Sequence, residues 1–204
     1  ENIYLTIAIV VVLMLVDYFL TLKGFALYKQ THAQYVDVES YELNPMLKRS
    51  VDQQKYSFQH LLSLVLVAVF LYGVDYLAQH QQFGFEAWAS PFIQGILLSM
   101  FVYINSRHIQ NLVVYRELKK DHSLLSGKIQ QKHLYSLHVS SAHAFGAFII
   151  LFILYLFVRS PFTLGFALGP LSIVLKNRRW IHQYMKKTHH HPHHPHTHHT
   201  KHHK

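Results

Sequence analysis

Apolar residues lie along the chain in long blocks that are separated by polar segments. The first block covers residues 3–22, and Asp17 is its only charged residue. About 20 residues of helix are needed to span the roughly 30 Å hydrocarbon layer of a membrane. The block therefore predicts a transmembrane helix over residues 3–23. A cleaved signal peptide is the alternative, but Tyr18 and Phe19 stand where the small residues of a cleavage site are expected.

The later apolar blocks predict four further helices, over residues 58–79, 91–118, 134–158 and 161–177. Gly165, Gly169 and Pro170 interrupt the last block, which therefore predicts a short, kinked or re-entrant span. The predicted fold is an all-α, polytopic integral membrane protein. It consists of a five-helix transmembrane bundle within residues 1–187, followed by a disordered, histidine-rich tail over residues 188–204.

The composition supports this fold class. Asp, Glu, Lys and Arg make up 14% of the residues, against about 25% in soluble domains. The formal net charge of +9 would suit nucleic acid, but the basic residues flank the apolar blocks and form no stripe interleaved with aromatic residues. Nucleic acid is therefore not an expected partner. The chain has no cysteine, so a bound metal would need nitrogen or oxygen ligands.

Lysine and arginine predict how the chain is oriented in the membrane. The segments after the first and third predicted helices and the C-terminal tail are basic, whereas the other two connecting segments contain only Arg159. Cytoplasmic loops carry an excess of Lys and Arg. We therefore expect an N-terminus outside and a C-terminus in the cytoplasm, in a cell or inner membrane, with the lipid bilayer as the first partner.

The C-terminal tail holds ten of the 19 histidines within its last 16 residues. Neutral imidazole is a common metal ligand, and a flexible run of histidines can wrap Cu²⁺, Ni²⁺ or Zn²⁺ without a preformed site. The alternatives are a purification tag and a pH-dependent basic tail that binds anionic lipid. The predicted metal ligands of the tail are His189, His190, His191, His193, His194, His196, His198, His199, His202 and His203.

Polar side chains inside the predicted helices fall at one common depth. At about 1.5 Å per residue, Asp17 and Thr21 lie in the cytoplasmic third of the first helix. They are one turn apart and share a face. Asn105, His108 and Asn111 lie in the same third of the third helix. Because ionisable groups at membrane depth cost several kcal/mol and usually face the bundle interior, this level is a candidate site.

The fourth predicted helix brings histidines to a similar depth. His138 and His143 are five positions apart, which separates them by roughly 140° on a helix of about 3.6 residues per turn. They cannot both bind one metal without distortion, so His138 with Ser141, or His143 alone, is expected to join the level. Asp75 is predicted near the outer end of its helix and outside this cluster.

A short motif in the first connecting segment carries a resemblance. Asp17-x3-Thr21 in an apolar helix is followed by Glu42-x-Asn44-Pro45 and a second span. Over its first two helices the chain resembles a family of small, uncharacterised prokaryotic membrane proteins with an Asp-x3-Thr and Glu-x-Asn-Pro pattern. The resemblance implies that these four polar residues act together, and it carries no activity.

Two interpretations of the polar level follow. The functional one is a metal or proton site built from Asp17, His108 and one histidine of the fourth helix, with Glu42 as a further ligand. The structural one is an interhelical hydrogen-bond network in which the polar groups satisfy one another, at about 0.6–2 kcal/mol per contact. Its polar members are Thr21, Asn44, Asn105, Arg107, Asn111 and Ser141.

Three functions compete at this stage. The chain is short, has no soluble catalytic domain and has no internal repeats, which favours a non-enzymatic, metal-handling or accessory subunit of a larger membrane complex. Its partners would be other membrane subunits or further copies of itself. A divalent metal transporter is the first alternative. An intramembrane metal-dependent hydrolase is the second, although no His-Glu-x-x-His pair is present.

Overall fold

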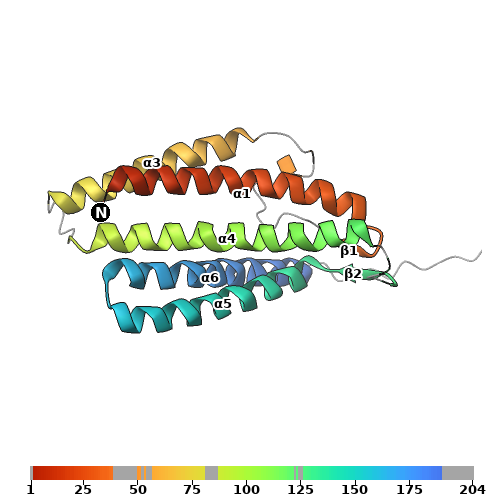
Figure 1. The fold of residues 1–204 in the computed structure, drawn as a ribbon. Coiled ribbons are helices and arrows are strands. Elements are labelled where there is room, and N and C mark those ends of the chain that lie inside the picture. The colour runs from red at the N-terminus through yellow and green to blue at the C-terminus, as the bar shows by residue number, and fades with distance from the viewer. Residues whose placement is uncertain are drawn as a thin grey trace, which may run out of the picture.

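The computed structural model describes residues 2–38, 50–51, 53, 57–80, 87–121, 123 and 126–189. Its elements in chain order are α1 (Ile3–Thr31), β1 (Val36–Val38), α3 (Phe58–Gln79), α4 (Ala89–Lys120), β2 (Ile129–Gln131), α5 (His133–Val158) and α6 (Pro161–His189). The long helices lie side by side with α4 in the middle (Figure 1). α1 packs against one side of α4 and α6 against the other, while α3 joins α1 and α5 joins α6.

Four of these helices, α1, α3, α4 and α5, are long and apolar enough to cross a membrane. The predicted helical architecture is confirmed, with four helices that could serve as membrane spans. α6 is not among the candidate spans because its second half is strongly polar, with Lys176, Arg178, Arg179 and Lys186. The fifth span therefore stays a prediction.

The predicted end of the last helix is wrong, because α6 continues past residue 177 to His189. Gly165, Gly169 and Pro170 do not shorten it. Proline removes one backbone hydrogen bond from a helix, and Pro170 is fully buried, where packing offsets that loss. The two glycines lie against the backbone of α4 and allow the helices to approach closely.

α1 is also longer than predicted. It passes the polar residues after position 22 and ends at Thr31, with His32 as its C-cap. Lys23 lies 5.7 Å from the centroid of the Phe19 ring and Lys29 lies 4.4 Å from that of Phe25. In each of these cation–π contacts the two residues are four positions, or about one helical turn, apart. Such contacts stabilise the helix beyond the end of the apolar block.

Two short strands, absent from the predicted all-α fold, tie the connecting segments together. β1 pairs in parallel with β2 in the register Val36↔Ile129, Asp37↔Gln130 and Val38↔Gln131. The Tyr28 hydroxyl donates to the Val36 carbonyl at 2.8 Å, which joins the pair to α1. Three-residue strands are too short for a period of two to stand out in a sequence.

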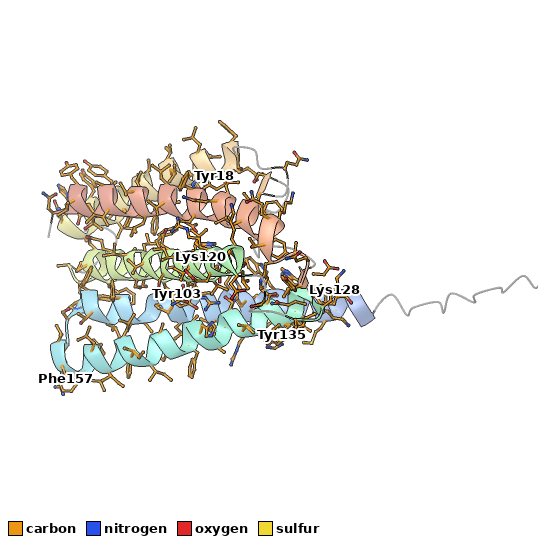
Figure 2. The ribbon with its side chains drawn as sticks, turned by 45° about the vertical axis from the view of Figure 1, so that its right-hand side comes forward. Tyr18, Tyr103, Lys120, Lys128, Tyr135 and Phe157 are labelled. Carbon is orange, nitrogen blue, oxygen red and sulfur yellow. The ribbon has the colours of Figure 1, made fainter. Side chains whose placement is uncertain are left out.

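The apolar core is divided between the two sides of α4. On one side Val10, Met14, Leu71 and Phe101 fill the space between α1, α3 and α4. On the other side buried residues of α5 and α6 pack together. The outer faces of α3 and α5 carry many exposed apolar side chains, and Phe157 of α5 is 83% exposed and points away from the bundle (Figure 2). This pattern fits helices that face lipid.

Candidate intramembrane polar site

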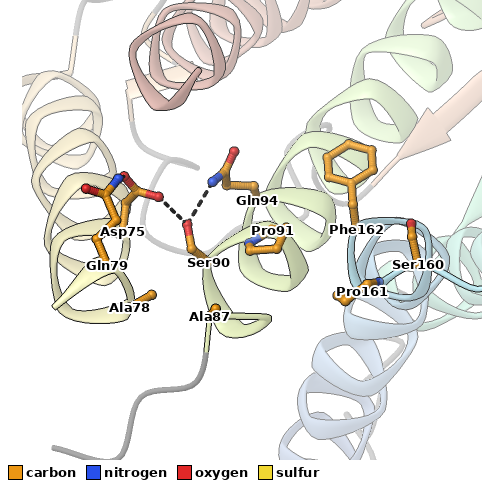
Figure 3. Close-up of a pocket in the computed structure, with 10 residues that line it drawn as sticks. All are labelled: Asp75, Ala78, Gln79, Ala87, Ser90, Pro91, Gln94, Ser160, Pro161 and Phe162. Atoms are coloured by element: carbon orange, nitrogen blue, oxygen red, sulfur yellow. Dashed lines mark hydrogen bonds between the residues drawn. The ribbon is translucent and has the colours of Figure 1, made fainter. Parts of the chain in front are cut away.

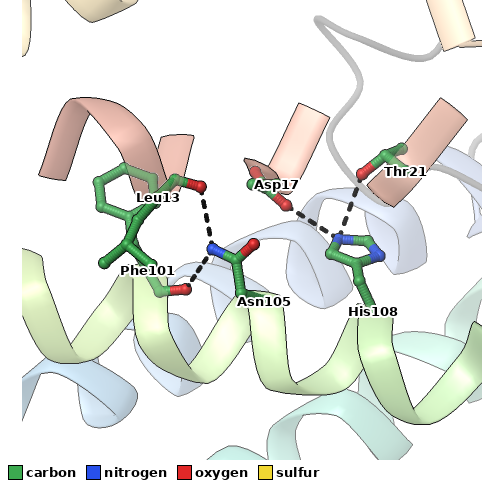
Figure 4. Close-up of polar contacts among 6 residues, drawn as sticks. All are labelled: Leu13, Asp17, Thr21, Phe101, Asn105 and His108. Atoms are coloured by element: carbon green, nitrogen blue, oxygen red, sulfur yellow. Dashed lines mark hydrogen bonds and ion pairs between the residues drawn. The ribbon is translucent and has the colours of Figure 1, made fainter. Parts of the chain in front are cut away.

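Asp17, Thr21 and His108 meet between α1 and α4 (Figure 4). Asp17 and Thr21 are one turn apart on α1, so they present one face to the facing helix. His108 Nε2 lies 3.0 Å from Asp17 Oδ1 and 3.2 Å from Thr21 Oγ1. The side chains of Asp17 and His108 are only about one-fifth exposed, at 21% and 19%. The structure thus brings together three of the residues that the sequence assigned to one depth.

One ring nitrogen of His108 faces two oxygen atoms, so the position of a proton decides the contacts. When Nε2 carries a proton, it can donate toward the Asp17 carboxylate or toward the Thr21 hydroxyl oxygen. When Nε2 carries none, the Thr21 hydroxyl donates to it, and an ionised Asp17 then faces a lone pair. The cluster is therefore a place where one proton can be held between two helices.

Asn105 lies one helical turn before His108 and joins the same two helices. Its Nδ2 donates to the Leu13 carbonyl of α1 at 3.0 Å and to the Phe101 carbonyl of its own helix at 2.8 Å. The residue is 5% exposed. Asn105 thus extends the polar contact along the α1–α4 interface.

His60 of α3 is a member that the sequence analysis missed. It is 8% exposed, its ring stacks on Tyr18 with centroids 4.4 Å apart, and it lies within electrostatic range of Asp17 and beside the Met14 carbonyl. The signal was present in the sequence: His60 directly precedes the apolar run that begins at Leu61. The predicted helix over residues 58–79 includes His60, but the polar level was assembled without this residue.

Four buried polar atoms around this cluster lack a hydrogen-bond partner among the described residues. They are Asp17 Oδ1, His60 Nε2, Asn105 Oδ1 and His108 Nδ1. Asp17 Oδ1 is at ion-pair distance from His108 without hydrogen-bond geometry. Unpaired polar atoms are costly in an apolar environment. Their concentration in one place marks this cluster as a site that can accept a proton, a water molecule or a cation.

The histidines of α5 do not reach the cluster. His138 and His143 are both exposed on α5. α5 packs against α6, and α6 lies between α5 and the α1–α4 interface (Figure 1). The expected ligand from this helix is therefore not brought to Asp17. Ser141 donates to the Leu137 carbonyl of its own helix at 2.8 Å instead of bridging helices.

The other predicted site residues lie apart or outside the described residues. Arg107 donates to Gln110 of its own helix at 3.4 Å, and Asn111 is half-buried on the same helix. Glu42 and Asn44 lie outside the described residues. In the tail, His189 ends α6 and nothing is described of its side chain, while the histidines from His190 onward lie outside the described residues.

A second polar network lies at the other end of the bundle, where α4 begins (Figure 3). The Thr6 hydroxyl donates to Gln94 Oε1 at 2.8 Å, and Gln94 Nε2 donates to the Ser90 oxygen at 2.8 Å. Ser90 in turn donates to Asp75 Oδ1 at 2.6 Å. As the sequence predicted, Asp75 does not join Asp17. The network that joins Asp75 to Ser90 and Gln94 of α4, and through Gln94 to Thr6 of α1, was not foreseen, because serine, threonine and glutamine do not stand out in an apolar pattern.

One histidine just outside the spans has a shifted pKa. His32 follows α1 and contacts the rings of Tyr28 and Tyr115, at centroid distances of 6.0 and 5.4 Å. Burial lowers the pKa of His32 below its ordinary value, and its Nδ1 is buried without a partner in the described part of the chain. This histidine therefore favours the neutral form in the folded protein.

Neither a metal-binding geometry nor a similarity to known proteins assigns a role to these contacts. Across the described ranges, no group of three or more His, Asp or Glu side chains is placed to hold a metal ion. The chain matches no protein-family model, no curated protein and no solved structure. Function has to be inferred from the contacts of this chain.

Proposed function

We propose that this chain is a non-enzymatic integral membrane protein that acts as an accessory subunit of a larger membrane complex. Its N-terminus would lie outside and its C-terminus in the cytoplasm, with α6 as a fifth span. The histidine-rich tail would give the complex a place to collect Cu²⁺, Ni²⁺ or Zn²⁺ on the cytoplasmic side.

The observation that carries this proposal is that the polar side chains at membrane depth link one helix to another. Asp17 and Thr21 contact His108, and Asn105 contacts the Leu13 carbonyl, so each contact links α1 to α4. An intramembrane hydrolase would need a metal-activated water, or a hydroxyl whose histidine base is oriented by a carboxylate on its other ring nitrogen. Thr21 and Asp17 both face His108 Nε2, and Nδ1 has no partner among the described residues. The Asp17 cluster instead offers groups that hold two helices together and can share a proton, which suits a structural subunit.

The uncovered apolar faces support an assembly role. α5 contacts the rest of the described bundle chiefly through α6, and α3 packs only lightly on α1 and α4. Both helices leave rows of exposed Leu, Val, Ile and Phe. At membrane depth such a face meets lipid or another helix, so the chain has ample surface for a partner subunit.

Isolation from native membranes tests this proposal. The full chain is extracted with its surrounding bilayer in polymer nanodiscs, and the mass and protein content of the particle are measured. We expect other membrane proteins or further copies of the chain in fixed ratio. A particle that holds a single copy of about 24 kDa and no other protein would overturn the proposal.

Metal analysis tests the role of the tail. The purified full chain is compared with a variant that ends at residue 187, each loaded with one metal at a time. We expect the bound Cu²⁺, Ni²⁺ or Zn²⁺ to be lost with the tail. An ion that stays bound to the shortened chain and disappears in Asp17→Asn would move metal handling to the intramembrane cluster.

A permease for a cation is the second candidate, and one observation favours it. The α1–α4 interface has the Thr6–Gln94 contact near one end and the Asp17 cluster toward the other. Val10, Met14 and Phe101 separate them as an apolar layer, which is how some pores are gated. Flux of a divalent metal or of protons into liposomes that contain the protein, lost in Asp17→Asn, would favour this function over the first.

A further inference from the structure

A cavity of about 420 Å³ opens at the end of the bundle where α3 ends and α4 and α6 begin (Figure 3). Its volume lies in the range of about 300–1,000 Å³ that is common for small-molecule sites. The wall combines polar and aromatic side chains from three helices and from the residue before α6. Those that matter for binding are Asp75, Gln79, Ser90, Gln94, Ser160 and Phe162.

Asp75 is the one charged residue among the described residues that line the cavity. Gln79 Nε2 donates to its Oδ2 at 2.6 Å, and Ser90 donates to its Oδ1 at 2.6 Å. In the described part of the chain no Lys, Arg or His lies at ion-pair distance from Asp75. The carboxylate is thus held in place by neutral donors, and its charge is not neutralised by the protein.

The residues behind Asp75 form a chain of hydrogen bonds that ends on its carboxylate. Ser90 and Gln94 are only 5% and 3% exposed. Gln94 Nε2 donates to Ser90, and Ser90 donates to Asp75. One N–H of each Gln amide remains, and so do the outer lone pairs of the Asp75 carboxylate and the Gln79 side-chain carbonyl, which are acceptors. A wall that keeps these acceptors and carries the negative charge of Asp75 favours a cationic hydrogen-bond donor.

We propose that this cavity binds a primary ammonium group, with Asp75 as its counter-ion. The N⁺–H groups would bond the carboxylate. Two sources offer this chemistry: the ethanolamine headgroup of a membrane lipid and a soluble amine. The lipid fits the position, because the cavity lies where spanning helices end. Trp88 is exposed beside the lining residue Ala87, and exposed Arg159 precedes Ser160, where it can meet a lipid phosphate.

Binding of defined headgroups to the purified full chain tests this site. Short-chain phosphatidylethanolamine, phosphatidylcholine and phosphatidylglycerol are compared with free ethanolamine by native mass spectrometry or thermal shift. We expect the ethanolamine lipid to bind about tenfold more tightly than the glycerol lipid. The choline lipid should be weaker than the ethanolamine lipid, because its nitrogen has no N–H to donate. If free ethanolamine binds as tightly as the lipid, the ammonium site holds and its source is soluble.

Two variants separate the site from general effects. Asp75→Asn should abolish the preference for ethanolamine over glycerol, whereas Glu117→Gln, which changes an exposed carboxylate at the opposite end of α4, should keep it. Ala87→Trp fills the mouth from an exposed lining position and leaves the hydrogen-bond chain intact, so it should block binding in a folded protein. Equal binding of the ethanolamine and glycerol lipids, or an undiminished preference in Asp75→Asn or Ala87→Trp, would overturn the proposal.

Discussion

The two sides of α4 are joined to their neighbours by different chemistry. On the α6 side the contact is backbone against backbone: an added Cβ at Gly165 would lie 1.9 Å from the Phe92 carbonyl oxygen, and one at Gly95 would lie 2.2 Å from that of Phe162. On the α1 side, beside apolar contacts such as Val10 and Phe101, polar side chains bridge the two helices, including Thr6 with Gln94 and Asp17 with His108. The α4–α6 interface depends on glycines that have no side chain, whereas the α1–α4 interface depends on side chains that form hydrogen bonds and an ion pair.

The difference follows from the membrane as a solvent. Lipid tails are as apolar as leucine, so burying leucine between helices brings little gain there. Helices then associate through close packing at small residues or through hydrogen bonds. Close packing uses many atoms at once and tolerates no added group. Polar links act one at a time, so they can be removed singly and can respond to protonation.

Gly165→Ala should have the largest effect on stability. The new methyl group would collide with the backbone of Phe92, which cannot move aside as a flexible side chain would. We expect a loss of about 1–3 kcal/mol or more in the free energy of unfolding, seen as a lower melting temperature in detergent. Gly146→Ala on α5 is the matched control, because nothing lies within 4 Å of its added Cβ. That variant should be neutral or up to about 1 kcal/mol more stable, and equal melting of the two variants would disprove the packing argument.

Asp17→Asn and His108→Gln should have the next largest effect. Each leaves a buried polar partner of the pair less well satisfied, at a cost of about 1–3 kcal/mol. The double variant should lose less than the sum, with a coupling free energy of about 0.6–1.7 kcal/mol. Thermal unfolding of all four proteins gives this value. Glu117→Gln serves as the control, since its exposed contact with Lys120 should contribute about 0–1 kcal/mol. Strict additivity would mean that Asp17 and His108 do not interact.

The residues of the polar α1–α4 interface were easier to predict from the sequence than those of the close-packed α4–α6 interface. Asp17 and His108 stand out because ionisable groups are rare in apolar blocks. The rise of about 1.5 Å per residue is enough to put them at one depth, with Thr21 one turn from Asp17. Which helices are neighbours could not be read in the same way. His138 and His143 fall at a similar depth but on α5, which packs on α6. The depth of a residue in the membrane follows from its position along its helix, whereas the choice of neighbouring helices depends on tertiary packing.

The glycines and the proline of α6 led to a wrong prediction of where this helix ends, for a related reason. Gly165, Gly169 and Pro170 are helix breakers by intrinsic propensity, and they predicted a short final span. In α6 the glycines are instead the points of closest approach to α4. The same residue type signals a break when nothing packs on it and a contact when another backbone does. Whether a glycine marks a helix break or a close contact depends on the helix that packs against it, and the sequence alone does not identify that helix.

Asn105→Leu should have a smaller effect than the Asp17 and His108 variants. Asn105 donates to two backbone carbonyls, Leu13 and Phe101, which lie inside helices and keep their own helical N–H partners. An apolar side chain of similar size then leaves no orphaned charge. We expect a loss near 0.6 kcal/mol, measured by the same thermal unfolding. A loss as large as that of Asp17→Asn would show that Asn105, through its unpaired oxygen, is a full member of the Asp17 cluster.

The smallest effect should come from His32, at the end of the α1–α4 interface. Burial lowers the pKa of His32 below 6.5, so as the pH falls the unfolded chain takes up a proton at this position before the folded one does. The folded state then loses stability as the pH drops through about 6.5, and this contribution vanishes at higher pH. Melting temperatures at pH 7.5 and 5.5 should therefore differ less in His32→Phe than in the parent. The exposed His182, changed to Phe, should leave the difference as it is, and an equal reduction in both variants would remove burial as the cause.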